Sequence, residues 1–470
     1  MGFNLGATKL RQRWTGDVER HVFESPLIRL MKDHHYSDIY EHGTEVTTGR
    51  PVPARSIWIY RYYEPVSKHL GTGERPEIED YAEGLHQSIE RIRAQVCGDS
   101  AGSSDDFRVY LVAHSMGGLI VRCYLQNICP KLGIKPPVDK VFTYATPHGG
   151  IDFRVIGNVP KFLTKNNIDN FNESRMRAYL KLPDGEPVNS LGDKFDPQRF
   201  FCLVGTNARD YAVAMGLSSF GTGPMGDGLV QINNAYVQGA PRAFVYRSHS
   251  GHFGIVNSEE GYQNLKRFLF GKVRVDGYLD VDDVRLHPKV EKARLEGKAI
   301  GASYHIEVIA GVRKGTWDLH RRVADENSAI FLKYQDIKQR QETNRPIQLL
   351  SAFLEKNTSD AVRRTLGFSI DLRVLVPEYE VERAWLPDLH YEGGHLFRDK
   401  INLEVTIGGN KPPALKYGFD RKTPNQIRYT ATGDQEKILD NGQYEYTIPI
   451  EQDTHPGLIG SLILRAQPWR

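Results

Sequence analysis

VYLVAHSMGG, residues 109–118, is the stretch that decides the fold of this 470-residue chain. An apolar run typical of a buried strand leads directly into Ala-His-Ser-Met-Gly, and a helix-like apolar run follows. A sharp strand-to-helix turn exposes the residue at its apex, and the close approach of the backbone requires small residues on both sides. Ala113 and Gly117 flank Ser115 and meet this requirement, although glycine is more usual at the first of these positions. The stretch therefore predicts a strand, a sharp turn at Ser115 and a helix.

A serine at such a turn is a candidate nucleophile. Its hydroxyl reacts poorly unless it is exposed, held rigidly and placed beside a base. The helix that begins at Met116 would point its first N–H groups toward an oxyanion formed on a substrate carbonyl. We interpret Ser115 as a catalytic nucleophile and the Met116 N–H as one oxyanion donor. The alternative is an incidental serine in an ordinary strand–turn–helix unit.

The chain around this stretch, up to about residue 270, alternates between strand-like and helix-like runs. Further strands are predicted at 56–63, 141–145, 200–204 and 243–246, and amphipathic helices at 78–92 and 259–269. Such alternation is typical of an α/β fold with a mainly parallel sheet and helices on both faces. In that architecture the catalytic partners follow the nucleophile in the order acid, then histidine.

Two histidines compete for the role of the base. Both lie in SHSGHFGIVNSEEGY (248–262), between the last predicted strand and the helix that follows it. We favour His252, because the apolar residues that follow it would pack beneath the loop and hold the ring. His249, which is closer to the end of the strand, is the alternative.

The acid is assigned to Asp227 in GPMGDGLVQINNA (223–235). Its flanking glycines permit a tight turn, and a buried turn suits a carboxylate that must orient an imidazole. Asp210, just after the strand at 200–204, is the alternative. His148 in ATPHGG (145–150) follows the strand at 141–145; we interpret it as a structural histidine that lines the pocket, with a second base as the alternative. These residues lack metal-ligand spacing, so we expect no metal and no cofactor.

Two apolar segments point to a hydrophobic substrate. Residues 151–197 separate two core strands by far more than an ordinary loop of about 2–6 residues, as a lid or acyl-pocket wall would. A second apolar loop, 213–225, leads into Asp227. Plain structural cover is the alternative. We expect the substrate pocket to be lined by His114, His148, Phe153, Phe162 and Met225.

The pattern changes after residue 271. Short alternating runs such as FSIDLRVLV and YEYTIPI, separated by turn residues, predict an antiparallel β-sandwich. We therefore predict an α/β domain over 1–272 and a sandwich-like domain over 285–470. His320, Trp385, His390 and His395 are scattered through the second domain without a catalytic pattern. Docking of a membrane surface, a protein or a carbohydrate there is as compatible with the sequence as a purely structural role.

Composition narrows the class of protein. The 61 basic and 58 acidic residues leave a net charge of +3, without the clustered basic excess that nucleic-acid binding requires. The four cysteines match neither a metal site nor a disulfide scaffold. No apolar run approaches the roughly 20 residues of a membrane-spanning helix, and the N-terminus does not resemble a signal peptide. We expect a cytoplasmic protein without a nucleic-acid partner.

Taken together, the motifs resemble a known family. AHSMGGLIVRCYL (113–125), ATPHGG (145–150), GDGLV (226–230) and HFGIVNSEEGYQNLKRFL (252–269) occur in order. They are similar to the lipase-like α/β hydrolases, in particular the branch with the lecithin–cholesterol acyltransferases and the GPI inositol-deacylases. The resemblance covers residues 1–270. It implies cleavage of acyl esters, often of lipids, through an acyl-enzyme.

The sequence departs from this family at its N-terminus. Members carry an apolar strand before the loop that supplies the second oxyanion donor, whereas here no strand is predicted before the helix at Pro26. The opening MGFNLG (1–6) is similar to the tail of that loop, which makes Gly2 and Phe3 candidate oxyanion residues. We hypothesise that a natural upstream segment is missing; a stop codon directly before Met1 would contradict this. An upstream signal peptide would also overturn the cytoplasmic assignment.

Three functions are compatible with these residues. The first is an esterase or lipase in which Ser115, His252 and Asp227 form a triad. The second is an acyltransferase, which differs from a hydrolase in how well its pocket excludes water. The third is an inactive binding or scaffold protein on the same fold. Covalent reactivity of Ser115 separates the first two from the third.

Overall fold

The structure is a computed structural model with two compact units, residues 1–241 with 247–269 and residues 242–246 with 270–470. It describes residues 8–12, 18–22, 25–41, 44–45, 52–62, 76–98, 105–151, 169–210, 225–251, 254–312, 315–355, 365–382, 387–406 and 414–470. None of the helices in these ranges is both long enough and apolar enough to cross a membrane.

A sheet at the centre of the α/β part carries the Ser115 turn. Its strands are β7 (Val109–His114), β8 (Val138–Tyr144), β9 (Phe200–Gly205) and β10 (Arg242–Val245), in the order β10-β9-β8-β7. The pairs β7–β8 and β8–β9 are parallel. All residues of β9 are buried, as the strands of a sheet covered on both faces should be. The prediction of an α/β fold with a parallel sheet is confirmed, and the carboxyl ends of these strands share one edge.

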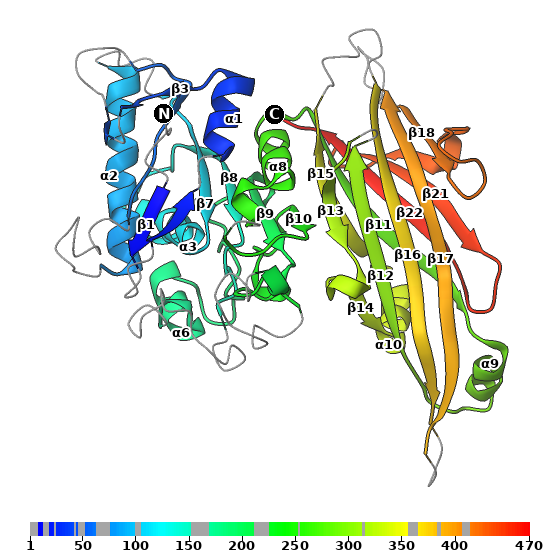
Figure 1. Ribbon diagram of the computed structural model, residues 1–470. Coiled ribbons are helices and arrows are strands. Elements are labelled where there is room, and N and C mark those ends of the chain that lie inside the picture. Colours follow the sequence, from blue (N-terminus) through cyan, green and yellow to red (C-terminus); the bar gives the residue numbers. More distant parts are fainter. Residues whose placement is uncertain are drawn as a thin grey trace. The chain divides into compact units, whose positions relative to one another are not determined.

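The described residues of the α/β part also form helices. They are α1 (Ser25–His34), α2 (Ile78–Cys97), α3 (Met116–Cys123), α4 (Cys129–Leu132), α6 (Glu173–Leu180) and α8 (Glu259–Phe270), with a π-helical turn, η2 (Tyr124–Ile128), between α3 and α4. Phe268 of α8 packs on Phe142 and Phe201 of the sheet, with ring centroids 6.0 and 5.3 Å away. Helix α2 lies on the opposite side of β7 and β8 from α8 (Figure 1). It buries the apolar positions whose spacing predicted it.

The predicted strand at 56–63 is much shorter in the structure. Among its described residues, 56–62, β6 (Ser56–Ile57) is the part that forms a strand, and it pairs in parallel with β3 (Ser37–Asp38). The aromatic residues that follow are held by side chains instead of a strand ladder. Tyr60 donates its hydroxyl to the carbonyl of Tyr81 over 2.8 Å, and the ring of Tyr62 meets the Tyr81 ring edge-on at 5.4 Å. Their aromatic character predicted a strand. In the structure these residues pack against α2 without forming one.

Short strands also precede α1, where the sequence predicted none. The strands β1 (Thr8–Gln12) and β2 (Val18–Val22) form an antiparallel pair with each other and do not join the parallel sheet. A further small pair is β4 (Tyr40–Glu41) with β5 (Thr44–Glu45). TKLRQ and VERHV carry too many charged residues for the buried apolar strand that the resemblance led us to look for. Gly2 and Phe3, the candidate oxyanion residues, lie outside the described residues.

The second unit is an antiparallel β-sandwich, as predicted. One sheet has the order β15-β11-β22-β21-β20 and the other β13-β12-β16-β17-β18-β19, with β14 paired to β12 (Figure 1). A single apolar core includes residues of both sheets, among them Leu279 and Leu462 from the first and Ile370 and Leu403 from the second. The strands are β11 (Val273–Arg285), β12 (Ile300–Val312), β13 (Asp318–Arg322), β14 (Ile330–Lys333), β15 (Ile347–Leu354), β16 (Thr365–Val381), β17 (Leu389–Thr406), β18 (Ala414–Phe419), β19 (Tyr429–Thr430), β20 (Glu436–Ile438), β21 (Tyr444–Gln452) and β22 (Gly457–Pro468); the helices are α9 (Pro288–Leu295) and α10 (Tyr334–Thr343).

The segment that the sequence left between the two domains is a strand of the sandwich. Residues 273–285 form β11, which pairs with β15 on one side and β22 on the other. The predicted start of the second domain at 285 is therefore too late. The run VRVDGYLDV does alternate, and its residues Val273, Val275 and Leu279 are buried.

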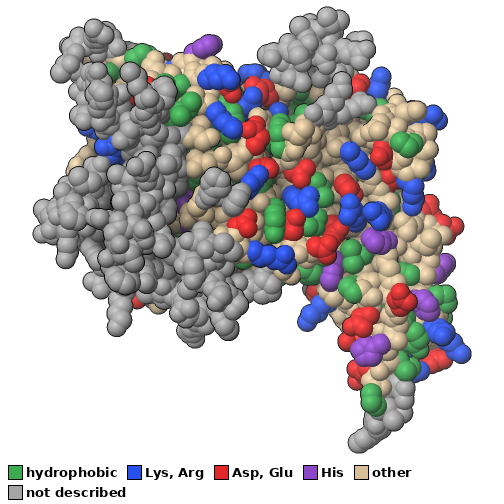
Figure 2. All heavy atoms as spheres, viewed as in Figure 1, with side chains coloured by type: hydrophobic (Ala, Val, Ile, Leu, Met, Phe, Trp, Pro, Cys, Tyr) green, Lys and Arg blue, Asp and Glu red, His purple; other side chains and the backbone are tan. Residues whose placement is uncertain are grey.

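Charges of both signs are interspersed on the surface of the second unit. Figure 2 shows Lys and Arg side chains next to Asp and Glu side chains over this part of the visible face. A cross-strand ion pair also lies below this surface: Arg465 and the buried Glu445 are 2.7 Å apart on neighbouring strands. Opposite charges at facing positions stabilise an antiparallel pair.

Candidate active site

Ser115 sits at a strained turn between β7 and α3. Its φ of 53° and ψ of −127° are rare for a residue with a side chain and store backbone strain. Three hydrogen bonds hold this conformation. The Ser115 N–H donates to the Tyr144 carbonyl over 3.0 Å, and the Ser115 carbonyl accepts from the Thr146 hydroxyl (2.9 Å) and the Gly118 N–H (3.1 Å). The turn therefore fixes the direction of the Ser115 side chain.

The two glycines after Ser115 play different roles. A Cβ on Gly117 would meet the Ala113 Cβ at 3.5 Å, which is an ordinary contact. A Cβ on Gly118 would lie 2.3 Å from the Thr146 hydroxyl oxygen, which is impossible without a shift. A small residue was predicted to be required at position 117, whereas the structure requires one at position 118.

His249 and Asp227 complete a hydrogen-bonded chain with Ser115. The Nε2 atom of His249 is 3.0 Å from the Ser115 Oγ, and its Nδ1 is 2.9 Å from Oδ2 of Asp227. The side chains of His249 and Asp227 are each only 2% exposed. Because a carboxylate only accepts, Nδ1 carries the proton and Nε2 can accept the serine hydroxyl. This is the arrangement that lets a histidine take a proton from serine.

Asp227 occupies the tight turn that was predicted for the acid. Its Oδ1 accepts from the N–H groups of Leu229 (3.0 Å) and Val230 (2.8 Å), which leaves Oδ2 for the histidine. The backbone closes the same turn, since the Asp227 N–H donates to the Val230 carbonyl over 3.2 Å. The alternative acid, Asp210, accepts a 2.7 Å hydrogen bond from Asn207.

The preference for His252 as the base is corrected by this geometry. His249 occupies the position between Ser115 and Asp227, and His252 lies outside the described residues. The apolar residues that had favoured His252, Ile255 and Val256, are buried in a short 3₁₀ helix. The signal that pointed to His249 was its closeness to the end of β10 at Val245. A histidine among the first residues of this loop stays at the sheet edge where Ser115 lies.

The other residues predicted to line a pocket have different surroundings. His148 is fully buried, and its Nε2 forms a 3.1 Å hydrogen bond with the Thr143 hydroxyl oxygen. Burial and the nearby Arg122 hold its pKa well below 6.5, so the ring is neutral. Met225 is partly exposed just before Asp227. The remaining aromatic positions, Phe153 and Phe162, lie outside the described residues.

Sequence reasoning missed a buried arginine below the Ser115 turn. Arg122 on α3 is completely buried, which lowers its pKa to about 10. It donates to the carbonyls of His148 (2.8 Å), Val188 (2.8 Å) and Ser190 (2.6 Å) and to the side chain of Gln126. These bonds tie α3 to two loops. An arginine in an apolar helix stretch was the signal, because buried arginine requires such partners.

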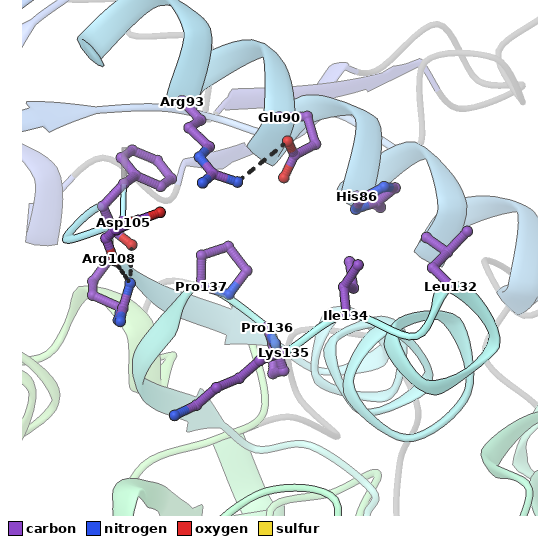
Figure 3. A pocket seen from close by; sticks show the side chains of 11 residues that line it. His86, Glu90, Arg93, Asp105, Arg108, Leu132, Ile134, Lys135, Pro136 and Pro137 are labelled. Atoms are coloured by element: carbon purple, nitrogen blue, oxygen red, sulfur yellow. Dashed lines mark hydrogen bonds and ion pairs between the residues drawn. The ribbon is translucent and has the colours of Figure 1, made fainter. Parts of the chain in front are cut away.

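A cavity of about 490 Å³ lies at the opposite end of β7 from Ser115 (Figure 3). Figure 3 shows His86, Glu90 and Arg93 of α2 above it, facing the segments that precede β7 and β8. Those segments enter the strands at their amino ends, whereas Ser115 follows the carboxyl end of β7. This cavity is therefore separate from the Ser115 site.

A cluster of three possible metal ligands lies in the second unit. Glu378, Glu380 and His390 place one ligand atom each within 4.8 Å of one another. All three are exposed, and they lie on the paired strands β16 and β17 of the second unit. They are not part of the Ser115 site.

Comparison with solved structures gave distant matches. The mature form of the lipase BlEst2 from Bacillus licheniformis shares 19% identity, with a TM-score of 0.28 over 41% of this chain and 73% of that chain. The phospholipase PlaB from Legionella pneumophila shares 14% identity, with a TM-score of 0.32 over 78% of this chain and 85% of that chain. No family model and no curated protein matches the sequence. Because these TM-scores are below 0.5, neither likeness supports a function, and the narrower resemblance to the acyltransferase and deacylase branch stays a prediction.

Proposed function

We propose that the protein is a serine hydrolase that cleaves carboxylic esters through an acyl-enzyme. The observation that carries this proposal is the continuous chain from Ser115 Oγ through His249 to Asp227, with steps of 3.0 and 2.9 Å. Hydroxyl, imidazole and buried carboxylate at these distances are the parts that activate a serine. The strained turn at Ser115 supports it independently, since backbone strain of this kind concentrates at functional sites.

The groups present account for each step of such a reaction. Ser115 Oγ attacks the ester carbonyl carbon while His249 Nε2 takes the hydroxyl proton, and Asp227 stabilises the resulting imidazolium. The Met116 N–H, at the start of α3, stabilises the oxyanion of the tetrahedral intermediate. Collapse breaks the bond to the alcohol, which leaves with the proton from His249. Water then attacks the acyl-enzyme with His249 as the base again, and Ser115 is restored.

The substrate class is proposed from the sequence. The apolar segments 151–197 and 213–225, which adjoin the catalytic loops, favour an ester with a hydrophobic acyl group. Most residues of the second segment, and residues 152–168 of the first, lie outside the described residues. A series of p-nitrophenyl esters of increasing chain length measures this preference directly.

The test of the proposed function is labelling with a fluorophosphonate probe, which reacts with activated serines without needing the true substrate. We expect the wild-type protein to be labelled and Ser115→Ala to be unlabelled. Ser115→Ala should also reduce p-nitrophenyl ester hydrolysis by about 10⁴-fold or more. A folded wild-type protein that takes up no probe would refute the proposal, as would a labelled Ser115→Ala variant.

A further inference from the structure

His114 connects the nucleophile strand to the loop of the base. It is the last residue of β7, directly before Ser115. Its Nε2 lies 2.9 Å from the backbone carbonyl oxygen of His249. The two imidazole rings are 4.9 Å apart between centroids and inclined by 45°. This is a direct link between two residues that are 135 positions apart in the sequence.

The acceptor of this hydrogen bond determines which ring nitrogen of His114 carries a hydrogen. A carbonyl oxygen can only accept, so Nε2 of His114 must carry hydrogen. His249 needs the opposite arrangement, with the proton on Nδ1 toward Asp227 and an unprotonated Nε2 that accepts from Ser115. The two neighbouring histidines therefore use opposite tautomers, and only His249 presents an accepting Nε2 to the nucleophile.

The same bond completes the support of the His249 backbone. The His249 N–H donates to the Asp227 carbonyl over 3.0 Å, and the His249 carbonyl accepts from His114. The His249 N–H thus links this residue to the turn of Asp227, and the His249 carbonyl links it to His114 at the end of β7. Because β7 also carries Ser115, any movement of the His249 loop away from the serine must break the bond to His114.

We propose that His114 is a positioning residue, which holds His249 at hydrogen-bond distance from Ser115 by donating to its backbone carbonyl. This inference rests on the proposed function and replaces the prediction that His114 binds substrate. A proton-transfer geometry is sensitive to such support, since a misplacement of about 1 Å costs on the order of 10²-fold in rate. A substrate contact would instead act mainly on KM.

Two substitutions separate the roles. His114→Gln keeps an N–H donor near the position of Nε2, and His114→Leu keeps the bulk but has no donor. With p-nitrophenyl butyrate, we expect His114→Leu to lose about 10- to 100-fold in kcat while KM stays within about twofold. We expect His114→Gln to recover most of this loss. The rate of fluorophosphonate labelling should follow kcat in both variants, and thermal unfolding checks that both are folded.

Several results would overturn the inference. They are a wild-type kcat in folded His114→Leu, a raised KM with unchanged kcat, and a His114→Gln variant as slow as His114→Leu. A measurement on the wild-type protein covers the case in which His114→Leu does not fold. In histidine-selectively ¹⁵N-labelled protein, NMR should show His114 as the Nε2–H tautomer and His249 as the Nδ1–H tautomer; an Nδ1–H tautomer at His114 would refute the proposal. Absent fluorophosphonate labelling of the wild type would refute the proposed function instead, and the tautomer of His114 would still be readable.

Discussion

At the scale of single residues, function depends on how a few side chains divide their hydrogen bonds. Asp227 gives one carboxylate oxygen to its own turn and the other to His249. His249 gives one ring nitrogen to the acid and the other to Ser115. The bonds of Asp227 to its own turn fix its carboxylate and leave Oδ2 for His249. The bond of His249 to Asp227 fixes the imidazole and leaves Nε2 for Ser115. A buried carboxylate or imidazole without such partners would be costly, which explains why the whole set is needed together.

The identity of the base gives the sharpest residue-scale prediction. His249→Ala should reduce kcat for p-nitrophenyl ester hydrolysis by about 10⁴-fold or more, since Ser115 then has no group to take its proton. The matched control is His252→Ala, a histidine three positions further along the same loop, which should retain activity within about tenfold of wild type. The reverse ranking of the two variants would mean that His252 is the base after all.

At the scale of secondary-structure elements, the close approach of α3 to the loop after β8 positions the turn. The Thr146 hydroxyl reaches the Ser115 carbonyl because Gly118 leaves room for it. Arg122 lies one turn further along α3 and donates hydrogen bonds to the backbone carbonyls of His148, Val188 and Ser190. Contacts at Gly118 and Arg122 thus hold the first two turns of α3 in place.

Gly118→Ala tests this anchoring, with Gly117→Ala as the matched control. The new Cβ at position 118 must displace Thr146, so we expect a loss of about 1–3 kcal/mol in the free energy of unfolding and slower probe labelling of Ser115. At position 117 the Cβ meets only ordinary contacts, and alanine favours the helix by up to about 1 kcal/mol. Urea denaturation and labelling rates measure both effects. Equal behaviour of the two variants would contradict the packing argument.

At the scale of the whole molecule, each unit buries a neutral histidine in its interior. His148 lies in the first unit and His320 in the second. Neither ring nitrogen of His320 has a hydrogen-bond partner among the described residues, and the ring packs edge-on against Phe244 with centroids 5.5 Å apart. Burial, and then the charges of Arg322 and Arg242, hold the pKa of His320 well below 6.5.

The sign of the resulting pH dependence follows from these lowered pKa values. Below pH 6.5 the unfolded chain takes up protons at both histidines, whereas the folded protein does not until the pH reaches the lowered values. The contribution of the two neutral histidines to the free energy of unfolding is therefore at its full value above about pH 6.5. It falls as the pH drops, by up to about 1.4 kcal/mol per pH unit for each histidine.

His320→Phe should reduce this acid sensitivity in the second unit. It keeps the ring contact with Phe244 and removes two unpartnered polar atoms, so stability at pH 7.5 should be unchanged or higher. Denaturation of both proteins at pH 7.5, 6.0 and 5.0 gives the slopes. His395→Phe, at an exposed position, should keep the wild-type slope. An unaltered slope in His320→Phe would show that His320 is not responsible.

Much of this protein was determined by its local sequence. The apolar strand, the small residues around Ser115 and the apolar helix that follows predicted the strained turn, because those requirements act within ten residues. Period-2 runs predicted the antiparallel sandwich, and the glycines around Asp227 predicted the tight turn of the acid. In each case the physical cause, steric or hydrophobic, lies in neighbouring residues.

The tertiary structure alone decided which distant groups meet. His249 and His252 are on one loop, and only the folded chain shows that His249 lies within hydrogen-bond distance of Ser115. The same holds for Thr146 against Gly118 and for His114 against the His249 carbonyl. Likewise residues 273–284, nearly all of β11, were left outside both predicted domains, and the two strand partners of β11 are distant from it in sequence. Hydrogen bonds between segments depend on distances of a few tenths of an ångström, and only the packed sheet sets those distances.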